Sequence, residues 1–305
     1  IAIVRQLHDG MLARVQEKGE TSEPFPVSNG VKQSCVLAPT LFSLVFSAML
    51  TDAFRNTDIG TGIKYRTDGS VFNFRRLQAI TNVSIDTVNV FLFADDCALN
   101  ATSEAAMQHS VDKFSDACNN FGLTISTKKT EVMHQPAPGK QYVEPSISVG
   151  GQELNAGNKF TYLGSTLSRN VVIDDEVNAR LAKASVTFGR LHKNILNRRN
   201  ITQETKIKVY RAIVLTTLLY GCETWTVYKR HARKLNHYHT TCLRKLLGIK
   251  WQDKIPDTEV LTRAGLPSIF TILMQSQLRW AGHVARMPDH RLPKKLLFGE
   301  LQEGK

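Results

Sequence analysis

One short stretch, residues 88–99, constrains the fold of this chain more than any other. An apolar run rich in β-branched and aromatic residues leads into two adjacent aspartates, Asp95 and Asp96, and a second short apolar run follows them. Two apolar runs on either side of so short a polar step predict a β-hairpin. The acidic pair is therefore expected at the tip of the hairpin or beside it.

The acidic pair allows two interpretations. Consecutive carboxylates repel each other and are costly where water is scarce, so a bound cation would explain them. Oxygen ligands favour a hard divalent ion, and Mg²⁺ typically uses one or two carboxylates together with substrate phosphates. Paired ions of this kind serve phosphoryl transfer. The alternative is a polar turn without a ligand, because turns favour aspartate in any case.

Charge is distributed unevenly along the 305 residues. The net formal charge is +12, which favours an anionic partner. Residues 1–170 hold 15 Lys and Arg against 16 Asp and Glu, whereas residues 171–305 hold 24 against 11. The acidic pair thus lies in a nearly neutral half, and a cationic surface is predicted for the other half. Charged helix faces are often only solvated, but so large an excess in one half favours a binding surface.

Several classes of protein fit this sequence poorly. Five cysteines without a Cys-x-x-Cys spacing indicate reduced thiols rather than a disulfide framework. A zinc site built from Cys222, Cys242 and the histidines between them would match no zinc-finger spacing. No signal peptide is visible, and the longest apolar stretch, residues 212–220, is too short to span a bilayer. We expect an intracellular protein, nuclear or cytoplasmic, without a membrane partner.

The periodicity of apolar residues changes near residue 170. Before that point it predicts helices over 1–15, 40–54 and 103–121, with short strands near 25–28, 60–77, 123–133, 147–154 and 160–167. From Ile173 to Ile195 apolar residues recur every three or four positions, which predicts a long amphipathic helix. Further helices are expected over 203–220, 229–246, 257–264 and 269–286. The predicted fold class is α+β, with a boundary between two domains near 168–172.

The order of four sequence motifs along the chain is informative. A Gly-Val-x-Gln loop at 30–33 precedes the helix start Pro-x-Leu-Phe at 39–42, and Phe-Ala-Asp-Asp follows at 93–96. Gly-Leu and Lys-Lys-Thr come next at 122–130, and then Tyr-Leu-Gly at 162–164. In this order the chain resembles the palm of a reverse transcriptase, most closely the endonuclease–reverse transcriptase polyproteins of RTE-like non-LTR retrotransposons. Segments 219–225 and 278–287 resemble regions downstream of the palm in those proteins.

The resemblance implies a fold, a reaction and a set of partners. Residues 1–170 would form a partial palm, an antiparallel sheet backed by helices, and residues 171–305 an all-α basic thumb with a C-terminal linker. The implied activity is RNA-directed DNA polymerisation with Mg²⁺ (or Mn²⁺). The implied partners are an RNA template, a DNA primer, their RNA–DNA hybrid and deoxynucleoside triphosphates. The alternative is a catalytically dead nucleic-acid-binding remnant of a decayed or domesticated element.

The resemblance also assigns roles to individual residues. Asp95 and Asp96 match the catalytic, metal-binding aspartates. Gln33, Pro39, Phe93 and Lys129 match positions near the nucleotide and template, although Phe93 would equally suit a core aromatic and Lys129 a solvated lysine. Residues matching the hairpin that holds the primer terminus are Tyr162, Leu163 and Gly164. Basic residues expected to form a strip against the nucleic-acid backbone are Arg180, Lys183, Arg190, Lys193, Arg198 and Arg199.

The sequence departs from the family pattern at three points. The first catalytic aspartate of the family lies upstream, in a strand that residues 1–305 do not contain. We therefore expect a piece of a longer protein, whose missing N-terminal polymerase and endonuclease segments would complete it. Ser34 stands where the loop usually has glycine, which strains any requirement for positive φ. Ala38 stands where serine is usual, which removes a hydroxyl group.

Overall fold

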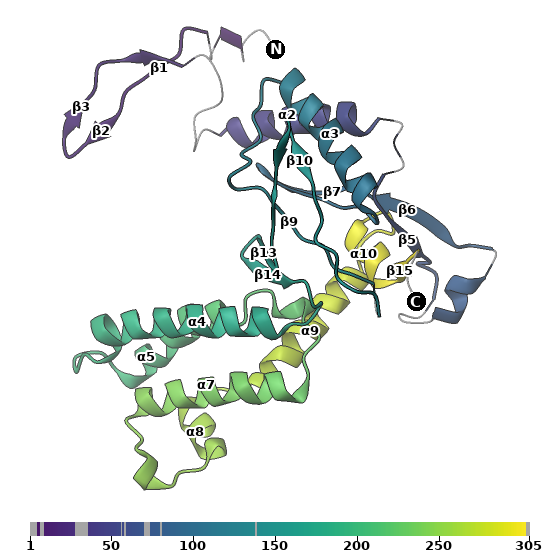
Figure 1. The fold of residues 1–305 in the computed structure, drawn as a ribbon. Coiled ribbons are helices and arrows are strands. Elements are labelled where there is room, and N and C mark those ends of the chain that lie inside the picture. Colours follow the sequence, from purple (N-terminus) through teal and green to yellow (C-terminus); the bar gives the residue numbers. More distant parts are fainter. Residues whose placement is uncertain are drawn as a thin grey trace.

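The computed structural model of the chain describes residues 5–6, 9–27, 36–55, 57, 59–69, 74–79, 81–137 and 139–302. Strands and two long helices make up the first part of the chain, and a bundle of helices lies below them in the view of Figure 1. The fold is α+β, as predicted. Its sheets are small, and all but one of the strand pairings are antiparallel.

Two helices pack against each other in the first part of the chain. Helix α2 (Ala38–Phe54) begins with Pro39 in its first turn, and α3 (Glu104–Asn120) begins after Ser103, whose hydroxyl accepts a hydrogen bond from the Ala106 amide at 3.2 Å. Both predicted helices are confirmed. The core between them is formed by buried Phe46, Met49, Ala53, Ala117 and Cys118.

Helix α2 is less buried than its sequence predicts. Its apolar residues occur on nearly every side, and this composition is typical of a helix enclosed by other elements. In the structure one face packs against α3, whereas Leu44 is 63% exposed and Val45 is 45% exposed. The described helix is therefore buried on the face that meets α3 and exposed on another.

The predicted helix over residues 1–15 is confirmed at residues 5–6 but is wrong from Leu12 onward, where strands form. Strand β1 (Leu12–Ala13) pairs with β4 (Phe25–Pro26), and β2 (Gln16–Glu17) pairs with β3 (Glu20–Thr21). Figure 1 shows these strands as an arm that extends away from α2 and α3. Lys18 and Gly19 both have positive φ, +50° and +92°, as the two-residue turn of a hairpin requires. This turn outweighs the helical spacing of the apolar residues.

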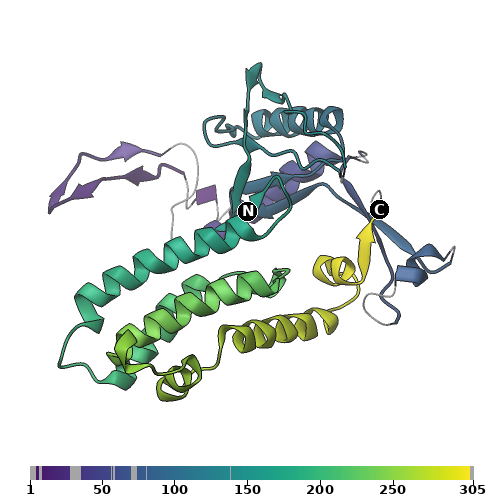
Figure 2. The same cartoon turned by 60° about the horizontal axis from the view of Figure 1, so that its bottom comes forward.

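The C-terminal end of the described chain joins two strands of the first half in a three-stranded antiparallel sheet. Its order is β15 (Gly299–Leu301), β5 (Thr61–Tyr65), β6 (Ser84–Val88). Figure 2 shows β15, the last strand, beside the strands of the first half. A Cβ on Gly299 would lie 2.6 Å from the Lys64 carbonyl oxygen, so this close pairing depends on glycine.

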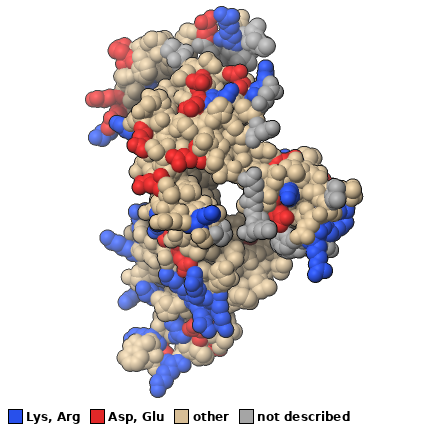
Figure 3. Space-filling view, turned by 45° about the vertical axis from the view of Figure 1, so that its right-hand side comes forward, with Lys and Arg blue, Asp and Glu red and all other residues tan. Residues whose placement is uncertain are grey.

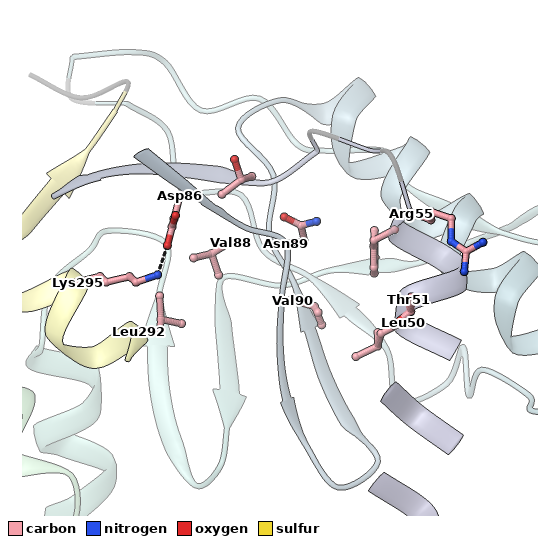
Figure 4. A pocket seen from close by; sticks show the side chains of 11 residues that line it. Leu50, Thr51, Arg55, Asp86, Val88, Asn89, Val90, Leu292 and Lys295 are labelled. Atoms are coloured by element: carbon pink, nitrogen blue, oxygen red, sulfur yellow. Dashed lines mark hydrogen bonds and ion pairs between the residues drawn. The ribbon is translucent and has the colours of Figure 1, made fainter. Parts of the chain in front are cut away.

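Helix α10 (Leu292–Leu297) brings β15 to this sheet. Lys295 on α10 forms an ion pair with Asp86 on β6, and its ammonium lies 5.2 Å from the centre of the Tyr65 ring. Figure 4 shows this pair at one side of a pocket, with Leu50 and Thr51 of α2 and the following Arg55 on the other. The C-terminal segment therefore packs directly on the first half of the chain.

Four further strand pairs lie in the described part of the first half, besides those of the arm and the β5–β6 pair. Strands β7 (Val90–Phe93) and β8 (Asp96–Leu99) form one hairpin, and β13 (Lys159–Tyr162) and β14 (Ser165–Ser168) form another. Strands β10 (Ser148–Val149) and β11 (Gln152–Glu153) turn at Gly150 and Gly151, which both have positive φ. The strand predicted over 123–133 is wrong for most of its length, because only β9 (Glu131–Val132) forms and pairs with β12 (Asn155–Ala156).

The second half is helical, as predicted. Helix α4 (Asp174–Leu191) continues into a π-helical turn η2 (His192–Leu196), and α5 (Gln203–Val209) continues through a second π-helical turn η3 (Tyr210–Leu215) into α6 (Thr216–Leu218). The next helices are α7 (Lys229–Leu247), α8 (Asp257–Ala264) and α9 (Ile269–Ala285). Their fully buried core includes Val177, Tyr210, Leu218, Leu235, Leu243 and Ile269.

The division into domains at residue 170 stays a prediction. Strands give way to helices between β14 and α4, where the boundary is expected. However, α9 runs from the bundle towards the first half in both ribbon views, and α10 and β15 complete the β5–β6 sheet. None of the helices in the described ranges is both long and apolar enough to cross a membrane.

A buried Tyr210–His239 pair should make the bundle sensitive to acid. The Tyr210 hydroxyl lies 2.8 Å from His239 Nδ1, both residues are fully buried, and burial lowers the pKa of His239 to about 4. In the unfolded chain a histidine is protonated near pH 6.5. As the pH falls from 6.5 to 4, the unfolded state binds the proton first, so the free energy of unfolding decreases.

We expect the chain to lose about 2 kcal/mol of stability from this histidine alone between pH 7 and pH 5. Urea unfolding at both pH values measures the loss, and His239→Gln should remove most of it. The control is His109→Gln, because His109 is exposed. An unchanged pH dependence in His239→Gln would contradict the assignment.

Candidate functional site

The acidic pair lies at the tip of the β7–β8 hairpin, as predicted. Phe93 pairs with Asp96 in the ladder, so the turn consists of Ala94 and Asp95. Ala94 has φ +51°, a left-handed conformation that costs an alanine about 1–2 kcal/mol. Backbone strain of this kind is common at functional sites. Asp95 and Asp96 are both exposed, which leaves their carboxylates accessible to a ligand.

The base of this hairpin is held by the core of the first half. Cys97 packs between α2 and α3 against the buried Cys118 cluster, and Leu99 packs against Val111 and its neighbours. Burial raises the pKa of the Cys97 thiol to about 11, and this thiol therefore stays neutral near pH 7. The hairpin therefore presents charged carboxylates at its tip from an apolar, uncharged base.

The donor set at the tip fits a hard divalent ion in part. Two exposed carboxylates supply oxygen ligands, which such ions prefer. Across the described ranges, neither carboxylate forms an ion pair with a Lys or Arg side chain, and no third His, Cys, Asp or Glu joins them in a metal-binding group. The described residues thus offer two carboxylates, as many as Mg²⁺ commonly takes from a protein when substrate phosphates complete its shell.

A tyrosine links the acidic hairpin to the β13–β14 hairpin. The Tyr162 hydroxyl donates to the Phe91 carbonyl oxygen at 3.2 Å and also lies 3.5 Å from the Asp96 carbonyl oxygen. Partial burial, with smaller effects of Cys97 and Asp96, raises the pKa of Tyr162, and the hydroxyl therefore remains protonated and can donate. Two predicted site segments, far apart in sequence, are thereby brought together.

The turn of the β13–β14 hairpin is held from below by the helical bundle. Leu163 and Gly164 both have positive φ, +49° and +81°, as a tight two-residue hairpin turn requires. Arg180 on α4 donates to the Gly164 carbonyl oxygen at 2.6 Å, and Lys183 approaches the same oxygen at 3.3 Å. Tyr220 donates to the Leu163 carbonyl oxygen at 3.1 Å. Both turn carbonyls are therefore hydrogen-bonded by side chains of the bundle.

The prediction that Arg180 belongs to an exposed basic strip is wrong. Arg180 is only 4% exposed, its Nε donates to Glu176 at 2.7 Å, and its guanidinium lies 4.6 Å from the centre of the Tyr220 ring. Glu176 is 5% exposed and also accepts from the Thr166 amide at 2.6 Å. Positions 176, 180 and 184 follow one another at helical spacing, so the pair lies on the buried face of α4.

The other basic residues of the predicted strip are exposed. Figure 3 shows Lys and Arg predominating over the lower part of the molecule and carboxylates gathered on the upper part. The strip that remains consists of Lys183, Arg190, Lys193, Arg198 and Arg199. We call this set the basic strip.

The structure also shows where the other predicted site residues lie. Phe93 is 62% exposed, so the interpretation as a core aromatic is wrong. Pro39 lies in the first turn of α2. Lys129 lies exposed in a turn, and its amide donates to the Ser126 carbonyl oxygen. No described hydrogen bond or ion pair joins Pro39 or Lys129 to the acidic pair. Gln33, with Ser34, lies outside the described residues.

Two residues that support the candidate site were not predicted from the sequence. Glu176 and Tyr220 hold the β13–β14 turn, but a charged residue in a first helical turn and a tyrosine after a helix carry no local signal of this role. Gly221 offers a weak signal, because it has φ +76° and a Cβ there would come within 3.2 Å of Ser165 Oγ. The histidines and cysteines considered for zinc form no such group within the described residues.

Comparison with known proteins bears on this site. A family model described as "Reverse transcriptase (RNA-dependent DNA polymerase)" matches residues 3–167, more than half of the chain. An uncharacterized transposon-derived protein of Caenorhabditis elegans is 29% identical over 209 residues, which are 65% of this chain and 72% of that protein. The RNA-directed DNA polymerases from mobile element jockey of Drosophila melanogaster and Drosophila funebris are 23% and 21% identical over 84% of this chain. The chain spans 26% of the length of each jockey polymerase.

Arg180 and Lys183 contact the same carbonyl oxygen and should differ sharply in their contribution to stability. Arg180→Ala leaves Glu176 buried and unpaired, so we expect a loss of about 3–5 kcal/mol. Lys183→Ala removes an exposed contact and should cost less than about 1 kcal/mol. Urea denaturation followed by circular dichroism measures both values. Equal losses in the two variants would contradict the structural role of Arg180.

Proposed function

The chain belongs to the reverse transcriptase (RNA-dependent DNA polymerase) family, and we propose that Asp95 and Asp96 are its catalytic carboxylates. Its relatives include polymerases of mobile elements, which assign it to the reverse transcriptase portion of a non-LTR retrotransposon. A catalytically dead remnant is not favoured by these relatives. The finer assignment to an RTE-like endonuclease–reverse transcriptase, and to the nucleus or the cytoplasm, is part of the proposal.

One observation carries the proposed reaction: an exposed acidic pair on a hairpin that Tyr162 links to a second hairpin. The reaction is the addition of a deoxynucleotide to a primer 3′-hydroxyl opposite an RNA template. Asp95 and Asp96 would hold Mg²⁺ (or Mn²⁺), which when bound stabilises charge on the attacking and leaving oxygens. Because the described residues supply only two carboxylates, we propose that a further ligand comes from outside them.

The β13–β14 turn is proposed to hold the primer end. Its carbonyl oxygens are fixed by Arg180, Lys183 and Tyr220, and its distance from the acidic pair is set by Tyr162. Gly164 has no side chain, so a nucleic-acid backbone could approach the turn closely. A rigid turn at a set distance from the carboxylates is what positioning of a primer hydroxyl requires.

The basic strip is proposed to hold the phosphates of the RNA–DNA hybrid. Its members lie on α4, on η2 and in the connection to α5, and each is exposed. Polymerases grip a duplex chiefly through its backbone, without reading bases. Gln33, Pro39, Phe93 and Lys129 are proposed to lie near the nucleotide and template, by their match to the family motifs.

Iron-directed cleavage would test the metal site without requiring activity. With Fe²⁺ in place of Mg²⁺ and with ascorbate, hydroxyl radicals form at the bound ion, so we expect backbone cleavage near residues 90–100. The double variant Asp95→Asn with Asp96→Asn should lose this cleavage. Asp116→Asn is the matched control, because Asp116 is an exposed carboxylate on α3. Persistent cleavage in the double variant would refute the assignment.

Primer extension tests the reaction itself. We expect purified residues 1–305 to extend a primed RNA template poorly, because their described part supplies two carboxylates where two clamped ions normally need a further ligand. In a protein extended towards the N-terminus, extension should appear and should fall to background on Asp95→Asn. Extension that survives Asp95→Asn in the longer protein would remove Asp95 from the proposed site.

Charge reversal tests the basic strip. Each duplex phosphate neutralised contributes about −0.9 to the slope of log K against log salt concentration. The triple variant of Arg190, Lys193 and Arg198 to Glu should therefore bind a hybrid duplex more weakly, with a slope flatter by about 2–3. The control is Arg14, Lys18 and Lys140 to Glu, an equal charge change at exposed residues of the first half. Equal effects in both triple variants would show that the net charge of the chain, and not the basic strip, accounts for the change in binding.

A further inference from the structure

An exposed tryptophan lies at the end of the helical bundle. Trp251 is 84% exposed, in contrast to Trp225 at 9%, and it lies in the short 3₁₀ turn η5 (Trp251–Asp253) between α7 and α8. In Figure 1 this connection lies at the outer end of the bundle, away from the β13–β14 hairpin. Trp251 therefore contributes little to the core and presents its ring to solvent.

The backbone around Trp251 is held on both sides. The Asp253 carboxylate accepts a hydrogen bond from the Lys250 amide at 2.7 Å, and the Lys254 amide bonds back to the Trp251 carbonyl oxygen at 3.3 Å. Arg244 on α7 donates to the Ile255 carbonyl oxygen at 2.6 Å and pairs with Asp257 at 2.8 Å. An aromatic ring mounted on such a turn loses little backbone entropy when it binds a partner.

Positive charge surrounds the exposed ring. Lys250 and Lys254 flank it in sequence, and Lys245 lies in the last turn of α7. Gln203 at the start of α5 donates to the Leu246 carbonyl oxygen, which brings Arg198 and Arg199 to the same end of the bundle. Within the described residues no ion pair engages these five cations. At the same end of the bundle, Asp257 is paired with Arg244, and Glu204 is paired with Lys208.

We propose that this end of the bundle binds single-stranded nucleic acid, with Trp251 stacking on an unpaired base. An exposed ring amid cations is the combination that single-strand binders use, because stacking accepts any base and cations contact phosphates. Bases within a duplex are stacked on each other, so the ring selects an unpaired strand. The site shares Arg198 and Arg199 with the basic strip, but Trp251, Lys250 and Lys254 lie outside the proposed polymerase residues, and the site does not depend on Asp95 or Asp96.

Anisotropy with labelled RNA tests the stacking directly. The probes are a single-stranded 12-nucleotide RNA and an abasic strand of equal length, measured with the full chain. We expect Trp251→Ala to weaken binding of the RNA about tenfold or more and Trp251→Phe to retain most of the affinity. The abasic strand should bind wild type and Trp251→Ala with equal affinity, because it has no base to stack. Lys250→Glu with Lys254→Glu should weaken both strands.

The matched control is Phe270→Ala, because Phe270 is an exposed aromatic on α9, 58% exposed, without adjacent charges in sequence. Its RNA affinity should stay within about twofold of wild type. Unchanged binding in Trp251→Ala, an equal loss on the abasic strand, or no binding of RNA by the wild type would each overturn the proposal. The Asp95→Asn, Asp96→Asn variant should bind the RNA as wild type does, which separates this outcome from failure of the polymerase proposal.

Discussion

The buried ion pair between Glu176 and Arg180 is the interaction on which the arrangement of the two halves depends. Both side chains are almost fully buried, and each also binds the β13–β14 hairpin, Glu176 through the Thr166 amide and Arg180 through the Gly164 carbonyl oxygen. Removing two charges from water is costly unless every donor and acceptor is used. Here both side chains also form hydrogen bonds to the backbone of the β13–β14 hairpin. The buried ion pair therefore holds the turn of this hairpin in one position on α4.

From this turn the geometry extends to the acidic pair through one side chain. Tyr162 belongs to the same hairpin, and its hydroxyl reaches the backbone of the β7–β8 hairpin beneath Asp95 and Asp96. A chain of contacts thus runs from α4 through the β13–β14 turn to the acidic tip. The α10–β15 segment makes a second connection between the halves, through the Lys295–Asp86 pair and the β5 ladder. Two independent connections restrict movement of the bundle relative to the acidic hairpin.

Prediction from sequence succeeded where one local rule dominated. The helices α7 and α8 follow apolar periodicity that no neighbour contradicts, and Ser103 and Gly122 mark the ends of α3 by local capping chemistry. It failed where a competing turn or a partner strand distant in sequence decided the local structure. The Lys18–Gly19 turn outweighed helical spacing from Leu12 onward, and the strand expected over 123–133 formed only at Glu131–Val132, where a partner strand was present.

The sequence by itself determined the acidic hairpin, the order of the motifs and the concentration of positive charge after residue 170, because these depend on neighbours in the chain. Only the tertiary structure decided which basic residues face solvent and which acidic ones support the site. Arg180 and Arg190 look alike in sequence, but only Arg180 meets a turn carbonyl and a buried glutamate. Such partners come from a segment folded separately, and periodicity along one helix carries no information about them.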